Sequence, residues 1–80
     1  MAITFDSLIT MLQHDLGVEV AEINKDTLLF SSGILDSFSL VNVLDFLERE
    51  GGLRVDPIDV TLENLDSIER MLAYVGRASA

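Results

Sequence analysis

The sequence predicts an all-α fold, a small four-helix bundle with three main helices, one short helix and a long ordered first loop. Apolar residues recur at helical spacing almost throughout, and the short Val18–Val20 stretch has no second strand to pair with. The 80 residues include one proline and no Gly/Ser-rich linker. We therefore expect a single domain over 1–80, with its core over about 4–77.

The first helix is expected over Thr4–Leu16. Thr4 can cap it, and Asp6 places an acid in the first turn, where the helix dipole favours negative charge. Gly17 is suited to ending the helix in a left-handed conformation. One apolar stripe contains Phe5, Leu8, Ile9, Leu12 and Leu16.

A long connection is expected over Gly17–Leu35. Loops of this length inside a small domain are uncommon and are usually functional. This one is too apolar to be a mobile loop, so we expect its apolar side chains to be tucked against the helices. They are Val18, Val20, Ile23, Leu28, Leu29, Phe30, Ile34 and Leu35.

The second helix is expected to begin at Asp36 or Ser37 and to run to about Glu50, before Gly51-Gly52. Its apolar stripe contains Phe38, Val41, Leu44 and Leu47, with Val41 and Leu44 expected mainly in the core.

An irregular segment with one short helical piece is expected over Leu53–Leu65, where Pro57 suits a first helical turn. Asp66 and Glu69 form a capping-box-like start for the last helix, which Gly76 ends or frays. The inner face of this helix contains Ile68, Met71, Leu72 and Val75.

Charge and composition exclude several classes of protein. Five basic and 14 acidic residues give a net charge of −9 and an isoelectric point near 4.1. This balance argues against binding to nucleic acid or to anionic lipid and favours partners with a basic patch. However, 49% of the residues are hydrophobic and the mean hydropathy is +0.38, so the chain is not a disordered acidic tail.

Cysteine is absent, which excludes disulfides, thiolate metal sites and a cysteine nucleophile. The single histidine, His14, is expected at the surface and not in catalysis. The acidic residues fit no calcium-loop pattern, so no metal site is predicted. No apolar run approaches the roughly 18 residues of a membrane span. We expect a cytoplasmic protein that does not bind membranes.

The segment from Ser32 to Leu40 contains the chemistry-bearing residues. Ser37 stands at the start of a helix, where free N–H groups and the helix dipole favour a phosphate. The carboxylate of Asp36 beside it can hold a hard metal such as Mg²⁺ during phosphoryl-group transfer. The competing interpretation is that Asp36 or Ser37 is simply a helix N-cap, the commonest reason for such a pair.

The wider sequence around this pair is similar to acyl carrier proteins and peptidyl carrier proteins. The resemblance runs from Phe5 to about Val75. It includes Leu28-Leu29-Phe30 before Gly33-Ile34-Leu35-Asp36-Ser37, the hydrophobic second helix, and a last helix introduced by Asn64-Leu65-Asp66-Ser67-Ile68. The resemblance implies an acyl-carrier-protein-like fold and a 4′-phosphopantetheine arm on Ser37. A phosphopantetheinyl transferase would transfer this arm from coenzyme A with Asp36 assisting the metal-dependent step.

The sequence around Ser37 differs from two groups of carrier proteins, and these differences restrict which carriers it resembles most. Fatty-acid carriers have acids directly after the serine, whereas this chain has no charge there until Asp45; modular synthetases usually have a Gly-Gly-His-Ser-like site. The Asp-Ser-Phe start is most similar to discrete carriers loaded by an adenylating ligase. The prediction is a stand-alone, monomeric acyl or aminoacyl carrier that holds its cargo as a thioester in a specialised biosynthetic pathway and is not an enzyme.

Two alternatives stay open: a fatty-acid synthase carrier, and an acidic helical interaction module in which Ser37 is only a helix cap. In the carrier interpretation, partner enzymes would dock on Phe38, Ser39, Asn42, Asp45 and Glu48. Phe46, Leu62 and Met71 would border a site for the tethered chain, with Phe46 narrowing it in favour of small cargo.

Overall fold

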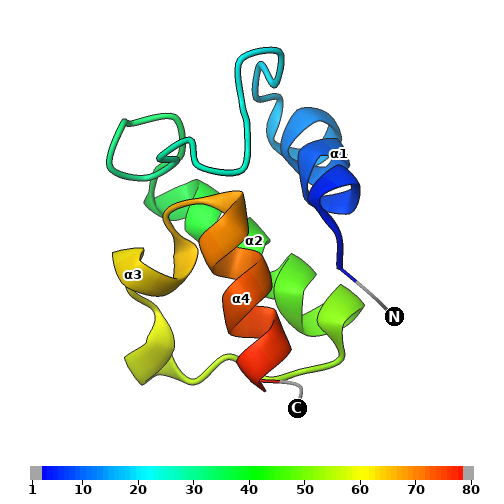
Figure 1. Cartoon of the computed structure of the whole chain (residues 1–80), viewed down its shortest axis with the longest axis vertical. Coiled ribbons are helices and arrows are strands. Elements are labelled where there is room, and N and C mark those ends of the chain that lie inside the picture. Colours follow the sequence, from blue (N-terminus) through cyan, green and yellow to red (C-terminus); the bar gives the residue numbers. More distant parts are fainter. Residues whose placement is uncertain (1–2, 79–80) are drawn as a thin grey trace.

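The computed structural model describes residues 3–78, which contain four α-helices and a 3₁₀ turn joined by loops (Figure 1). The elements are α1 (Phe5–Leu16), α2 (Ser37–Gly51), η1 (Pro57–Asp59), α3 (Leu62–Leu65) and α4 (Ile68–Ala78). No strand occurs within this range. The predicted all-α bundle with three main helices and a long first loop is therefore confirmed. The connection before α4 contains two short helical pieces, where the sequence predicted one.

Helix α1 begins and ends as predicted. Thr4 Oγ1 accepts a hydrogen bond from the Ser7 backbone N–H at 3.1 Å, and Ser7 Oγ accepts one from the Thr4 N–H at 2.9 Å. This reciprocal capping box satisfies two N–H groups that the helix leaves unpaired. Gly17 ends the helix with φ 67°, a conformation that a side chain disfavours.

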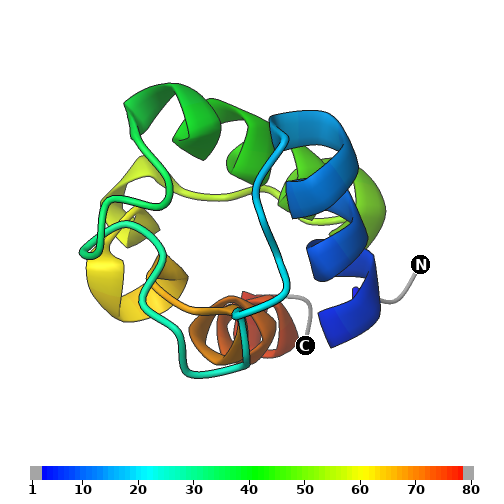
Figure 2. The ribbon, with the colours of Figure 1, turned by 90° about the horizontal axis from the view of Figure 1, so that it is seen from above.

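The connection from α1 to α2 is packed onto the bundle, and Figure 2 shows it crossing between α1 and α4 before it reaches α2. Its main apolar anchors are the buried side chains of Ile23, Leu29 and Leu35. The prediction that all its apolar side chains are tucked in is wrong for Leu28 and Ile34, which are 43% and 40% exposed. Neighbouring side chains point in different directions around a tight turn, so Leu28 and Leu29 cannot both face the core.

Helix α2 buries a different face from the predicted stripe. Val43 and Leu47 are fully buried and Leu44 is partly buried against the core, but Val41 is 66% exposed. At about 100° per residue, Val41 lies roughly 200° around the helix axis from Val43 and so points into solvent. The prediction of Val41 as a core residue is therefore wrong.

Two predictions about α4 are also wrong. Asp66 lies in the α-helical region and ends α3, and the Arg70 N–H is capped instead by Ser67 Oγ at 3.2 Å. The Asp66 carboxylate is engaged elsewhere, as described below. Gly76 does not end the helix, which continues to Ala78, since glycine weakens a helix without forbidding it. Pro57 does occupy a first helical turn, in η1.

The core lies between the four helices and the loop. From α4 it receives Ile68, Met71 and Tyr74, with Leu72 and Val75 partly buried beside them. Tyr74 is an addition to the predicted inner face, and its hydroxyl donates a hydrogen bond to Asp59 Oδ2 at 3.1 Å. Within residues 3–78, no helix is both long enough and apolar enough to cross a membrane.

Candidate functional site

Asp36 is the residue that caps α2. Its backbone is extended, and its Oδ1 atom accepts a hydrogen bond from the Ser39 N–H at 2.9 Å. The backbone and side-chain hydrogen bonds from Ser39 hold the pKa of Asp36 below its ordinary value. The carboxylate is therefore ionised at neutral pH, and it is exposed beside Ser37.

Ser37 is the first residue of α2 and is exposed. Its hydroxyl makes no hydrogen bond to any residue in the described range 3–78. Ser37 is thus not the helix cap, and its oxygen is free to react. An exposed hydroxyl at a helix N-terminus, next to an ionised carboxylate, fits both a phosphodiester on Ser37 and a divalent cation on Asp36.

Apolar side chains lie exposed near the start of α2. Phe38, directly after Ser37, is 83% exposed, and Val41 lies one turn further along. Buried placement would be the ordinary state of such residues, so their exposure marks a surface suited to contact with another protein.

The predicted docking residues of α2 fall into two groups. Asn42 and Asp45 are exposed, and Asp45 pairs with Arg49 at 3.1 Å. Ser39 and Glu48 are half-buried and engaged within the chain. The Ser39 N–H donates to Asp36, and Glu48 Oε2 accepts from the Val55 N–H at 2.8 Å.

A cavity of about 160 Å³ lies between the first loop, α2 and the η1–α3 segment. Its lining residues are Phe30, Leu40, Val60, Thr61, Leu62 and Leu65. Leu40 follows Ser37 by less than one helical turn, so the cavity is near the start of α2. Thr61 is the single hydroxyl residue of an otherwise apolar lining.

Of the three residues predicted to border a site for the tethered chain, only Leu62 lines this cavity. Met71 is 1% exposed within the core, and Phe46 packs partly buried against the core. Phe46 lies about 120° around the helix axis from Leu40 and nearly two turns further along α2, and it does not line the cavity. Phe30 is the aromatic residue that bounds it.

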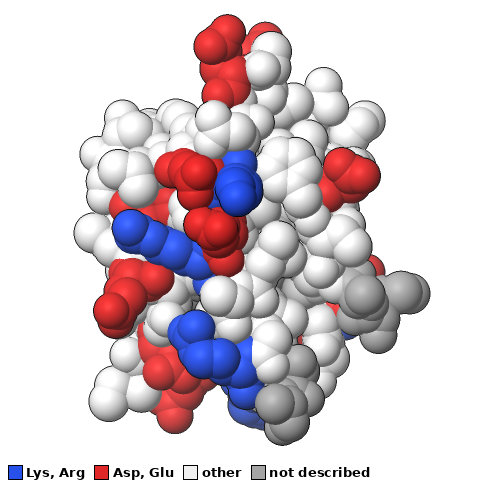
Figure 3. Space-filling view, in the orientation of Figure 1, with Lys and Arg blue, Asp and Glu red and all other residues white. Residues whose placement is uncertain are grey.

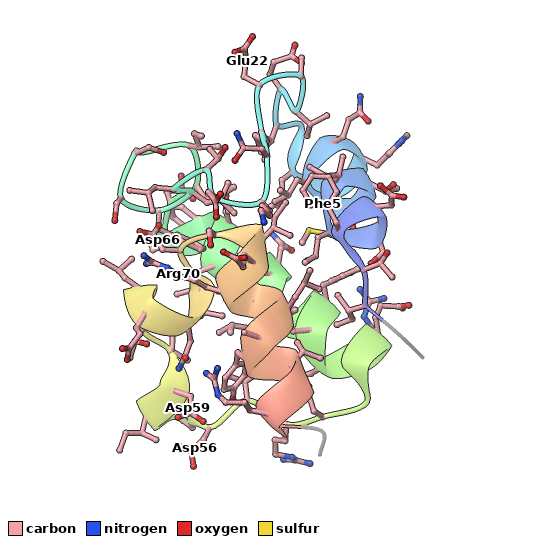
Figure 4. All side chains as sticks on the ribbon, viewed as in Figure 1. Phe5, Glu22, Asp56, Asp59, Asp66 and Arg70 are labelled. Atoms are coloured by element: carbon pink, nitrogen blue, oxygen red, sulfur yellow. The ribbon has the colours of Figure 1, made fainter. Side chains whose placement is uncertain are left out.

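Asp66, labelled in Figure 4, has a role that its sequence context does not predict. This side chain is 2% exposed, and its carboxylate accepts hydrogen bonds from Phe30 and Ser31 in the first loop. Burial alone would raise the pKa of Asp66, but these hydrogen bonds and the nearby Arg70 charge together lower it. No local signal reveals this role, because the partners lie about 35 residues earlier in the chain.

Charged side chains are intermixed over α3 and α4, as Figure 3 shows on the left of that face. Lys25 pairs with Glu69 at 3.8 Å, and Arg70 lies 4.0 Å from Asp66. Most of the 14 acids have no basic partner among residues 3–78, so the net charge of −9 still favours basic partners. His14 is exposed on α1, and the described residues contain no group of three His, Cys, Asp or Glu that could hold a metal.

Comparison with known proteins agrees with this arrangement. The family described as "Phosphopantetheine attachment site" matches residues 6–75. The chain is also similar to a D-alanyl carrier protein from Abiotrophia defectiva, with 31% identity over 75 residues. That match covers 94% of this chain and 95% of the relative.

Proposed function

We propose that Ser37 is the attachment residue of this chain, which belongs to the phosphopantetheine-binding family of carrier proteins. The chain is therefore a carrier, not an enzyme, and its cofactor is phosphopantetheine, as the sequence predicted. The observation that supports Ser37 is its exposed, unbonded hydroxyl at the start of α2, beside a carboxylate that already serves as the cap. When bound, the arm supplies the thiol that this cysteine-free chain lacks, and the thiol holds cargo as a thioester.

Asp36 has a separate role in the proposed attachment. In the transfer, Ser37 Oγ bonds to the phosphorus on the pantetheine side of coenzyme A and the pyrophosphate bond breaks. Adenosine 3′,5′-bisphosphate leaves with Mg²⁺, and the hydroxyl proton of Ser37 passes to a base of the transferase or to water. One oxygen of the Asp36 carboxylate accepts the hydrogen bond from the Ser39 N–H, and the other oxygen would be available to bind Mg²⁺. The first N–H groups of α2 then favour the phosphodiester that remains on the serine.

The cargo is proposed to be an aminoacyl or short acyl group, loaded by an adenylating ligase. Support comes from the similarity to a protein named as a D-alanyl carrier and from the cavity near Leu40. A cavity of about 150 Å³ accommodates one benzene molecule, so about 160 Å³ has room for roughly six heavy atoms. A long acyl chain would not fit in it.

The proposed partners are a phosphopantetheinyl transferase, the ligase and downstream biosynthetic enzymes, all meeting a monomeric carrier in the cytoplasm. Their docking would centre on Phe38, with Asn42 and Asp45 on the same face of α2. The charge-free half of α2 before Asp45 favours a partner set different from that of fatty-acid carriers, because rim charges mainly steer and select. A tethered cargo then meets each partner at high effective concentration.

An intact-mass experiment tests the attachment residue. The apo protein is incubated with coenzyme A, Mg²⁺ and a broad-specificity phosphopantetheinyl transferase. We expect the wild type and the control Ser7→Ala, whose hydroxyl lies on α1, to gain one phosphopantetheine, and Ser37→Ala to gain none. A gain that survives Ser37→Ala would overturn the assignment, and no gain in the wild type would favour the acidic interaction module.

A second experiment tests the cargo. The modified protein is offered to ligases that adenylate amino acids and, separately, to an enzyme that loads long fatty acids. Efficient loading by the fatty-acid enzyme alone would favour the fatty-acid synthase alternative. Amide shift changes provide the structural control: a small cargo should perturb Leu40 and Leu62, whereas chain-length-dependent shifts deep in the bundle would contradict the small cavity.

A further inference from the structure

Asp66 connects the α3–α4 junction to the loop that precedes Ser37 (Figure 4). Its Oδ1 atom accepts hydrogen bonds from the N–H groups of Phe30 at 2.7 Å and Ser31 at 2.9 Å. Its Oδ2 atom accepts one from Ser31 Oγ at 2.5 Å. The Asp66 backbone carbonyl accepts a further bond from the Leu29 N–H at 2.6 Å. One buried residue thus holds three consecutive residues of the loop.

Two of these residues, Leu29 and Phe30, shape the turn that leads to Ser37. The Leu35 N–H donates to the Leu29 carbonyl at 2.8 Å, and the Gly33 N–H donates to the Phe30 carbonyl at 3.1 Å. The side chains of Leu29 and Leu35 are 0% and 3% exposed, so both ends of this turn are anchored in the core. Only Asp36 separates Leu35 from Ser37. A shift of the held residues would therefore move the start of α2 or the turn beside it.

The contacts of Asp66 explain why a buried carboxylate is present at this position. It does not cap α4, and its nearest cation, Arg70, is 4.0 Å away with a half-exposed side chain. A buried charge is costly unless it is hydrogen-bonded, and here three donors surround the two oxygens. Those donors all belong to the first loop, so the buried carboxylate fixes the position of that loop against the α3–α4 junction.

We propose that Asp66 is a positioning residue for the modification of Ser37, holding the 29–35 turn in the one arrangement that the transferase recognises. The inference rests on the proposed attachment at Ser37. Asp66 touches neither Ser37 nor the incoming group; it acts through the Leu29–Leu35 turn.

The kinetics of phosphopantetheine transfer test this role in the full chain. If Asp66→Ala leaves the turn correctly arranged in a tenth of the molecules, the apparent KM for the carrier rises about tenfold while kcat is nearly unchanged. Asp66→Asn keeps one oxygen for the two loop N–H groups and should restore KM to within about threefold of the wild type. Ser31→Ala removes one bond and should give an intermediate KM.

Tyr74→Phe is the matched control, because it removes a side-chain hydrogen bond between α4 and η1, away from this turn. Measurements are made at a temperature where circular dichroism shows every variant folded. An unchanged KM in folded Asp66→Ala, or an equal rise in Tyr74→Phe, would overturn the proposal. If Asp66→Ala does not fold, the KM values of the remaining variants test the proposal. KM should rise above the wild-type value in Ser31→Ala and stay unchanged in Tyr74→Phe, and any other result would overturn the proposal.

Hydrogen exchange of the Leu35 amide separates this inference from the proposed function. We expect the amide to be protected in the wild type, to exchange at least about tenfold faster in Asp66→Ala, and to be unchanged in Tyr74→Phe. If the wild type were not modified on Ser37, the attachment proposal would fail even with this exchange pattern. If the wild type were modified but exchange and KM did not respond to Asp66, only the positioning role would fail.

Discussion

Replacing two neighbouring leucines separately should show that the first loop is part of the core. Leu29 is 0% exposed, whereas Leu28 is 43% exposed. Leu29→Ala removes roughly three methylene equivalents, or about 2.4 kcal/mol of transfer free energy. The cavity left behind raises the expected loss of unfolding free energy to about 3–4 kcal/mol. Leu28→Ala loses about half of the transfer term and leaves no closed cavity, so about 1 kcal/mol is expected.

The difference is large for a domain of this size, whose total stability is expected to be about 4–12 kcal/mol. Urea unfolding followed by circular dichroism at 222 nm measures both variants, with the m-value checked for constancy. The melting temperature of Leu29→Ala should fall by about 4–8 °C per kcal/mol. Equal losses for the two variants, or a loss below about 1 kcal/mol for Leu29→Ala, would refute the conclusion that the loop is packed.

Three further predictions follow from the described contacts. Burial opposes ionisation of Asp66, but hydrogen bonds from Ser31 and Phe30 lower its pKa below the ordinary 3.8. Its stabilisation is therefore complete well above pH 3.8 and lost as pH falls through the lower folded-state pKa, so urea titrations should show the advantage over Asp66→Asn shrinking below about pH 4. Phe38→Ala should change the unfolding free energy by less than about 0.5 kcal/mol, because the side chain is 83% exposed, yet raise the transferase KM; an unchanged KM would remove Phe38 from the docking surface. Gly76→Ala should stabilise α4 by about 0.5–1 kcal/mol in urea titrations, because a Cβ there meets no atom within 4 Å, whereas Gly52→Ala, at φ 64°, should destabilise by about 1 kcal/mol or more; a loss in the first or a gain in the second would contradict these backbone assignments.

Features that depend on neighbouring residues in the chain could be predicted from the sequence. Thr4 and Gly17 delimit α1, and Asp36 caps α2, because capping bonds join residues only a few positions apart. The same locality places Ser37 at the start of a helix. The helical class follows from apolar spacing, which is likewise a local property.

The tertiary structure decided which of several locally reasonable roles each side chain takes. Asp66 has the sequence context of a cap, but donors from Phe30 and Ser31 occupy its carboxylate, and Ser67 caps the next helix instead. Val41 is spaced like a core residue, but its side chain is 66% exposed on the solvent side of α2. The physical reason is the same in both cases: hydrogen-bond partners and burial are set by segments that are distant in sequence, and only the assembled fold brings those segments together.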